Sequence, residues 1–142
     1  MAKQIHLVVV SQEKQLLDTE VDSVTAPTTE GEITVLAGHI PLFSKLQTGE
    51  LIYRIGHEAT TIVISAGFLD MSPDDKMMIL VDSAVHEREI SLEKAEAAVK
   101  AAQTTMALPS LSQREQIMAE ASLRRALLEV KVAQRTKSAS RV

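Results

Sequence analysis

The four histidines, His6, His39, His57 and His86, are the side chains of this sequence best suited to acid–base or metal chemistry. None of them lies four residues from another on a predicted helix, so the paired spacing of helical zinc ligands is missing. The chain also has no cysteine, which excludes thiolate nucleophiles, disulfides and cysteine-based metal sites. The sequence therefore predicts no metal site and no resident metal cofactor.

Motifs for nucleophilic or phosphate chemistry are missing as well. The sequence contains no G-x-S-x-G elbow, no G-x-x-x-x-G-K-[ST] loop and no G-x-G-x-x-G turn. Carboxylates are numerous, but they gather in turns such as Asp74-Asp75, where exposure to water explains them. Nothing beyond the number of carboxylates supports a pair of catalytic carboxylates like that of glycosidases. The sequence therefore gives no support for nucleophilic, phosphate-binding or glycosidase-type chemistry.

His39 stands in the stretch GEITVLAGHIPLFSKLQTGEL, residues 31–51. No base, nucleophile or metal ligand accompanies it, and Pro41 restricts the backbone two residues later. We interpret His39 as a loop histidine whose ring bonds the backbone, or as part of a contact surface. Catalysis by His39 is the alternative, and it predicts that His39→Ala abolishes turnover of the isolated protein.

Residues 1–87 have the pattern of short strands. Apolar and β-branched residues alternate or run together at 5–10, 51–56, 61–65 and 77–81. Turn signals separate these runs, among them Ala26-Pro27-Thr28 and Ser72-Pro73-Asp74-Asp75. Closely spaced short strands without a helix predict an antiparallel β sandwich or barrel. Hydrophobic residues make up 45% of the 142 residues, which is enough to build its core.

Residues 88–142 have a helical period instead. Ser91 is a predicted N-cap, and one stripe follows it: Leu92, Ala95, Val99, Ala102 and Met106. Pro109 should end this first helix. A capping box, Ser112-x-x-Glu115, should begin a second helix that runs to about Arg135. The two helices are predicted to form an antiparallel hairpin.

The second helix carries two separate apolar arcs on a helical projection. One consists of Ile117, Ala121, Leu128 and Val132, and the other of Leu123, Leu127 and Val130. We expect one arc to pack on the first helix and the other to meet a different surface. Because alanine dominates the first helix's stripe and buries little area, the hairpin should dock weakly and move.

Composition and charge restrict the partners. Aromatic residues make up 2% of the chain and tryptophan is absent, so binding of nucleic acid through stacked bases is not expected. Residues 1–113 carry 8 Lys/Arg against 16 Asp/Glu, whereas residues 114–142 carry 7 against 3. No apolar run approaches the roughly 20 residues that span a bilayer. We expect a cytosolic protein that reaches a membrane only through a partner.

The stretch at 31–51 resembles the Gly-acidic turn and Gly-His-x-Pro-Leu signature of the epsilon subunit of bacterial F-type ATP synthase, called delta in mitochondria. HLVVVSQEKQLLDTEVDSVTAP, ISAGFLDMSPD and ILVDSAVHEREISLEKAEAA agree with that family in order and spacing. The resemblance covers essentially the whole chain. It implies a β sandwich of about ten strands, residues 1–87, followed by a two-helix hairpin, residues 88–142.

The resemblance also implies a non-catalytic rotor subunit of a proton-transporting synthase, on the cytoplasmic face of the bacterial plasma membrane. The sandwich would join the gamma subunit to the c-ring, with Glu32, His39 and Pro41 at the contacts. The hairpin would restrain ATP hydrolysis by reaching the α and β subunits. Arg124 and Arg125 are the candidates for that contact, and Leu123, Leu127 and Val130 for packing on gamma.

Nucleotide binding is where the sequence departs from the family pattern. Members that bind ATP in the folded hairpin carry Ile/Leu-Asp-x-x-Arg-Ala, and Ser91 and Lys94 replace the charged pair here. Lysine lacks the planar fork that holds two phosphate oxygens. Ser91, Lys94, Arg124 and Arg125 thus form at most a weak ATP site. A free adaptor or nucleotide sensor is the competing reading, and it predicts no stable complex with a gamma-like subunit.

Overall fold

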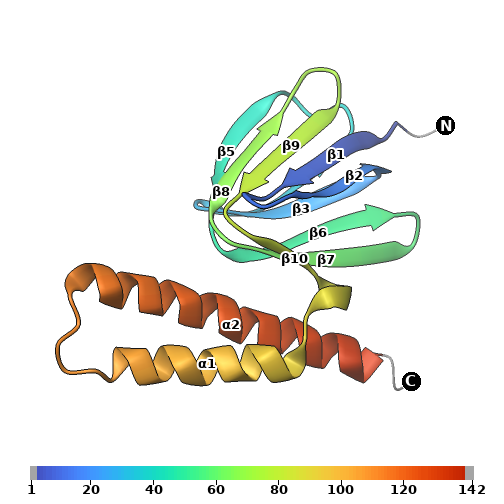
Figure 1. The fold of residues 1–142 in the computed structure, drawn as a ribbon. Coiled ribbons are helices and arrows are strands. Elements are labelled where there is room, and N and C mark those ends of the chain that lie inside the picture. The colour runs from blue at the N-terminus through green and yellow to red at the C-terminus, as the bar shows by residue number, and fades with distance from the viewer. Residues whose placement is uncertain (1–2, 140–142) are drawn as a thin grey trace. The chain divides into compact units, whose positions relative to one another are not determined.

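The computed structural model describes residues 3–139 (Figure 1). The chain divides into two compact units, Met1–His86 and Glu87–Val142. The first unit is built from strands and the second from helices. We call them the β unit and the hairpin. The expected fold class, a ten-stranded β domain followed by two helices, is confirmed.

Ten strands make up the part of the β unit that the structure describes. They are β1 (Ile5–Val10), β2 (Gln15–Val21), β3 (Ser23–Thr28), β4 (Gly31–Leu36), β5 (Leu42–Leu46), β6 (Gly49–Ile55), β7 (Glu58–Ile64), β8 (Gly67–Met71), β9 (Lys76–Val81) and β10 (Ala84–His86). Their order in the sheet is β10-β7-β6-β3-β5-β8-β9-β1-β2, and β4 pairs with β3. The sheet curls around one core.

One strand pair differs from the predicted antiparallel arrangement. β1 runs antiparallel to β2 but parallel to β9, with His6 opposite Lys76 and Val10 opposite Leu80. A parallel pair cannot be joined by a tight turn, and these two strands are separated by most of the unit's sequence. Turn signals and local periodicity report only on residues that are close in sequence, so they could not predict this pairing.

Strand alternation places the core side chains. Ile5, Leu7 and Val9 of β1 and Met77 and Ile79 of β9 are fully or almost fully buried. Val8, which points to the opposite face of β1, is also buried, at 5% exposure. Three of the four residues of the apolar run 7–10 are therefore buried, and they include Val8 on the opposite face of the strand.

The predicted turn at Ala26-Pro27-Thr28 is wrong, because these residues lie in β3 and are buried. Pro27 has no N–H to offer its neighbours, but its carbonyl accepts a hydrogen bond from the Gln47 amide at 2.9 Å. Gly49 provides the space beside the ring. A Cβ added at Gly49 would lie 2.7 Å from Pro27 Cβ.

The hairpin consists of a short 3₁₀ turn, Glu87–Glu89, followed by α1 (Leu92–Met106) and α2 (Gln113–Ala139). Both predicted caps form. Ser91 Oγ accepts from the Lys94 amide at 3.3 Å, and Ser112 Oγ accepts from the Glu115 amide at 3.1 Å. The Glu115 carboxylate accepts in return from the Ser112 amide at 3.4 Å. α2 continues beyond the predicted end at Arg135, because no glycine or proline interrupts its last turns.

The packing face of α2 coincides with neither predicted arc, because among its buried residues only Val132 belongs to one of them. The side chains that are buried on α2 are mainly alanines, namely Ala119, Ala126, Val132 and Ala133. From the first arc Ile117 is 58% exposed, and from the second Leu127 is 51% exposed. α1 contributes Ala95 and Ala102 as its buried residues. The two helices pack through small side chains, which let their backbones approach closely, and large apolar residues remain outside.

Candidate docking sites

The loop between β4 and β5 carries two of the three expected contact residues, His39 and Pro41, and both are exposed. His39 Nδ1 lies 2.7 Å from the Ile40 carbonyl oxygen, and the His39 amide donates to the Leu36 carbonyl at 3.2 Å. The predicted bond from ring to backbone is thus confirmed. Ile40, between them, is 74% exposed. The loop presents polar and apolar contacts together.

A carboxylate from a distant turn holds this loop. Asp75, between β8 and β9, accepts from the Gly38 amide through Oδ1 at 2.7 Å. Gly38 has φ +85°, a conformation that side chains rarely adopt. Asp75 itself has φ +59°, in the left-handed region that aspartate and asparagine tolerate. The loop is therefore fixed at its centre by a charge-assisted hydrogen bond.

Replacing Asp75 by alanine should loosen this loop. The Gly38 amide would lose its partner, and alanine would occupy a left-handed backbone position, at a cost of about 1–3 kcal/mol. We expect hydrogen exchange at the Gly38 amide to accelerate at least about tenfold. Asp75→Asn is the matched control, because asparagine keeps both the backbone preference and an acceptor oxygen. Equal exchange rates in the alanine and wild-type chains would contradict this role.

Glu32 lies apart from His39 and Pro41. It is exposed in β4, opposite Pro27 of β3, whereas the loop begins beyond the other end of that strand. At about 3.3 Å per residue, the strand from Gly31 to Leu36 spans roughly 16 Å. The structure thus places the expected contacts at two ends of one exposed edge strand rather than in one cluster.

An exposed apolar surface, which the sequence did not indicate, covers the outside of β5, β8, β9 and β1. We call it the outer apolar face and define it by Val10, Phe43, Phe68 and Leu80. Pairing sets Phe68 opposite Leu80, and Leu80 opposite Val10. The Phe43 and Phe68 rings stack with centroids 5.6 Å apart. These strands lie side by side in Figure 1.

Exposure distinguishes this face from an ordinary surface. Phe43 is 69% exposed, Phe68 46% and Leu80 50%. Single exposed apolar residues are common, but contiguous ones mark binding surfaces. A hollow of about 310 Å³ opens beside them, lined by Val10, Ser11, Gln12, Gly67, Phe68, Leu80, Val81 and Asp82. The alternation of residues in β9 was visible in the sequence. The residues that lie beside Leu80 come from other strands, so the sequence did not show that they gather on one face.

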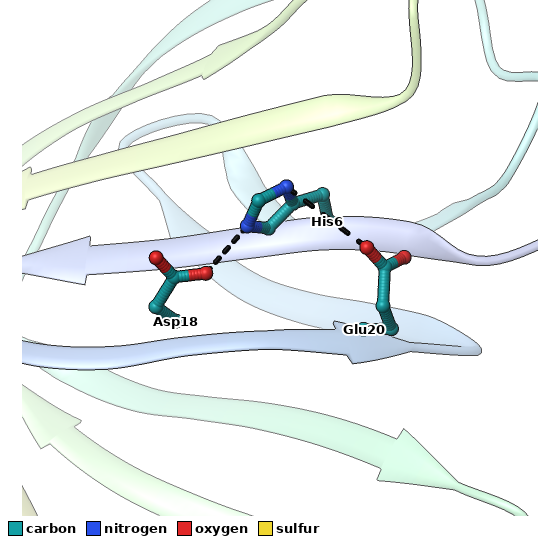
Figure 2. Close-up of polar contacts among 3 residues, drawn as sticks. All are labelled: His6, Asp18 and Glu20. Atoms are coloured by element: carbon teal, nitrogen blue, oxygen red, sulfur yellow. Dashed lines mark hydrogen bonds and ion pairs between the residues drawn. The ribbon is translucent and has the colours of Figure 1, made fainter.

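His6 forms a polar cluster with Asp18 and Glu20 on the side of β1 where Val10 also lies. Its Nε2 lies 2.5 Å from Asp18 Oδ1, and its Nδ1 lies 3.9 Å from Glu20 Oε1 (Figure 2). All three side chains are between 41% and 57% exposed. Ion pairs at such exposure contribute at most about 1 kcal/mol. The described residues contain no group of three ligands that could hold a metal ion.

The hairpin residues expected to bind nucleotide lie on different parts of the two helices. Ser91 and Lys94 form the cap of α1, where the Ser91 hydroxyl already accepts a hydrogen bond. Arg125 instead lines a groove of about 490 Å³ with Ala98, Ala101, Ala102, Thr105, Glu115, Met118, Ala119 and Ser122. Arg124 is exposed. Beside the start of α1 the structure places Ala133, Thr136 and Lys137.

Of the residues expected to pack on gamma, Leu127 is exposed, and Leu123 and Val130 are half-buried. Exposed apolar residues also occur towards the loop end of the hairpin, at Leu108, Ile117 and Met118. No helix in residues 3–139 is long and apolar enough to cross a membrane. Surplus apolar area is thus present on the hairpin, as predicted, but on other residues besides the expected arc.

Two carboxyl groups have shifted pKa values. The Ser72 hydroxyl donates to Asp74 and lowers the pKa of Asp74, so this contribution to stability is lost as pH falls below the ordinary value of 3.8. Burial raises the pKa of Glu129 on α2, and the nearby Arg125 opposes the shift. Ionised Glu129 thus destabilises the folded hairpin.

Glu129→Gln should therefore stabilise the hairpin at pH 7. Because the pKa of Glu129 is raised by folding, the wild-type chain is favoured below the ordinary value of 4.5 and loses that advantage as pH rises through the folded pKa. The glutamine variant should lose this part of the pH dependence. Helix melting by circular dichroism at pH 4 and pH 7 measures it, with the exposed Glu120→Gln as control. Destabilisation at pH 7 by Glu129→Gln would contradict the assignment.

Comparisons with known proteins agree with this two-unit architecture. Residues 4–87 match the family described as ATP synthase, Delta/Epsilon chain, beta-sandwich domain. The ATP synthase epsilon chain of Dehalococcoides mccartyi is 42% identical over 138 residues, covering 95% of each chain. That of Syntrophobacter fumaroxidans is 40% identical over 136 residues, covering 96% of this chain and all of that one.

A solved structure agrees as well. The match is one chain of a structure described as the OSCP/F1/c-ring part of the Euglena gracilis mitochondrial ATP synthase. Its TM-score is 0.75 and its sequence identity 29%, covering 90% of this chain and 80% of that one. The fold is thus that of an ATP synthase subunit. The chain belongs to the delta/epsilon family of ATP synthase subunits.

Proposed function

We propose that the chain is a non-catalytic central-stalk subunit of a proton-transporting F-type ATP synthase. Its β unit joins the gamma subunit to the c-ring, and its hairpin restrains ATP hydrolysis by contacting the α and β subunits. The observation that carries this proposal is the 42% identity to an ATP synthase epsilon chain over 95% of both chains. The subunit works on the cytoplasmic face of the bacterial plasma membrane and is held there through the complex.

The geometry of the β unit supports a docking role rather than catalysis. His39 is exposed and its ring is hydrogen-bonded to the backbone, while the loop around it is fixed by Asp75. A fixed loop loses little conformational entropy when a partner binds it. His39 and Pro41 contact one partner surface, and Glu32 contacts another, because the two sites lie at different ends of β4. This separation suits a subunit that links two partners.

The hairpin geometry supports a movable element. Its two helices meet through alanines, which bury little apolar area, while large apolar residues stay exposed. Arg124 and Arg125 contact acidic surfaces of the catalytic subunits in the extended hairpin. Leu123, Leu127 and Val130 pack on gamma. Ser91, Lys94, Arg124 and Arg125 bind ATP weakly at most, and a calorimetric titration that gives micromolar affinity would contradict this.

The docking role of the loop is tested with a complex of α, β and gamma subunits that lacks this chain. We expect His39→Ala to weaken binding to it about tenfold, which corresponds to about 1.4 kcal/mol. His57→Ala is the matched control, because His57 is also an exposed histidine of the β unit. Failure of the wild-type chain to bind would contradict the proposed function. Unchanged binding of His39→Ala would exclude His39 from the contacts with the α, β and gamma subunits.

A further inference from the structure

We propose that the hairpin binds the hairpin of a second copy of this chain, through the groove between α1 and α2. This inference goes beyond the proposed function and does not depend on it. The groove has a volume of about 490 Å³. Its walls include four residues of α2, namely Glu115, Met118, Ser122 and Arg125, and they face small residues of α1.

The shape of the groove suits one large apolar side chain. Ala98 and Ala101 line it from α1 and Ser122 lines it from α2, and all three are exposed. Met118 is the large apolar residue beside them, and it is 61% exposed. Methionine is unbranched and flexible, so it fills irregular gaps between small residues. Met118 of one copy can therefore enter the alanine-lined part of the groove on the other.

The four α2 residues complement themselves when two copies of the helix run antiparallel. Their spacing of three, four and three residues puts them in one row, which is the spacing with which packed helices interlock. Glu115 and Arg125 lie five residues on either side of position 120, and Met118 and Ser122 lie two on either side. A two-fold axis at this position therefore sets each carboxylate opposite a guanidinium, and each large side chain opposite a small one.

The charged groups have the capacity for these contacts between copies. Glu115 accepts from the Ser112 amide through Oε1, and a carboxylate can accept several further hydrogen bonds. Arg125 interacts with Glu129, and a guanidinium has five N–H donors, enough for a second carboxylate. Glu120, at the axis, bonds Gln116 instead, and residues two apart on a helix do not face the same way. The two copies of Glu120 are thus kept apart.

The contact is small, which sets its expected strength. Two short helix segments bury less area than a standard stable interface, so we expect a dissociation constant of about 10–100 µM. Arg125 lies inside this contact. The dimer therefore excludes the proposed contact of Arg125 with the α and β subunits, and it occurs only in chains outside the complex.

The test is sedimentation equilibrium of the full chain from about 5 to about 500 µM, which covers this range. Arg125→Glu should weaken dimerisation about tenfold or more, because it sets carboxylates opposite each other. Lys131→Glu is the matched control, since it makes the same charge change at an exposed position of α2 outside the groove, and it should change the constant less than about twofold.

A mixing experiment makes the test specific to this register. The Arg125→Glu and Glu115→Lys chains should each fail to dimerise alone, whereas a mixture of the two should form dimers, because every carboxylate again meets a cation. Met118→Glu is an independent variant that should also weaken dimerisation about tenfold or more. Circular dichroism of each variant at about 5 µM, where the chain is monomeric, verifies that the helices remain folded.

Each outcome decides the proposal. Dimers that the groove variants lose and that the mixture regains support it. A wild-type chain that stays monomeric at about 500 µM overturns it, and so do dimers that persist in both Arg125→Glu and Met118→Glu. A monomeric chain whose groove becomes protected from hydrogen exchange only when the complex of α, β and gamma subunits is added assigns the groove to a partner protein, which overturns the proposal and leaves the proposed function intact.

Discussion

Gly67→Ala is expected to destabilise the β unit by about 3 kcal/mol or more, a large fraction of the stability of a small domain. A Cβ at Gly67 would lie 2.0 Å from the Leu80 carbonyl oxygen and 2.7 Å from Val81 Cα. Both are backbone atoms of the paired strand β9, so no side-chain rotation can make room. The β8–β9 pairing must open, and the outer apolar face is built on that pairing.

Gly56→Ala is the matched control for this effect. Gly56 has φ +62° and nothing within 4 Å of an added Cβ, so the substitution adds backbone strain without a collision. Its cost should be about 1–2 kcal/mol. Urea unfolding of the two variants measures the difference. Equal destabilisation by the two substitutions would show that the β8–β9 contact at Gly67 relaxes, contrary to the geometry.

Removal of residues 88–142 should leave a folded, binding-competent β unit and relieve inhibition. The two units divide between His86 and Glu87, and the buried apolar cluster of the β unit draws all its members from residues 5–81. In a complex of α, β and gamma subunits, we expect ATP hydrolysis with the truncated chain to exceed that with the full chain by about threefold or more, equivalent to at least about 0.6 kcal/mol.

Binding and hydrolysis have to be measured together for this truncation. Arg124→Ala with Arg125→Ala in the full chain is the companion variant, because it keeps the hairpin but removes the charges proposed to meet the catalytic subunits. This double variant should relieve part of the inhibition of ATP hydrolysis. An unfolded truncation would contradict the separation of the units. A folded, bound truncation with unchanged hydrolysis would contradict the restraining role of the hairpin.

The features predicted correctly from sequence are those that local interactions determine. Ser91 and the Ser112–Glu115 box lie within one turn of the amides that they cap, so their positions in the sequence are enough. The short strands follow from alternation over five to seven residues. The bond from the His39 ring to the backbone likewise joins neighbouring residues.

The features that were missed depend on contacts between distant segments. The helical projection of α2 assigned Ile117 and Leu127 to the two apolar arcs expected to pack, whereas the helix packs through Ala119, Ala126 and other small residues. Close packing favours small side chains, and hydrophobicity alone does not reveal them. Similarly, Phe43, Phe68 and Leu80 gather only because β5, β8 and β9 pair. The Asp75–Gly38 bond joins residues 37 apart.

The most direct test of the account is a titration of the full chain into a purified complex of α, β and gamma subunits that lacks it, with ATP hydrolysis recorded throughout. The account predicts that hydrolysis falls to a lower plateau when one chain is bound per complex, and that the chain alone hydrolyses no ATP. Hydrolysis that stays constant while no chain is retained by the complex would contradict it.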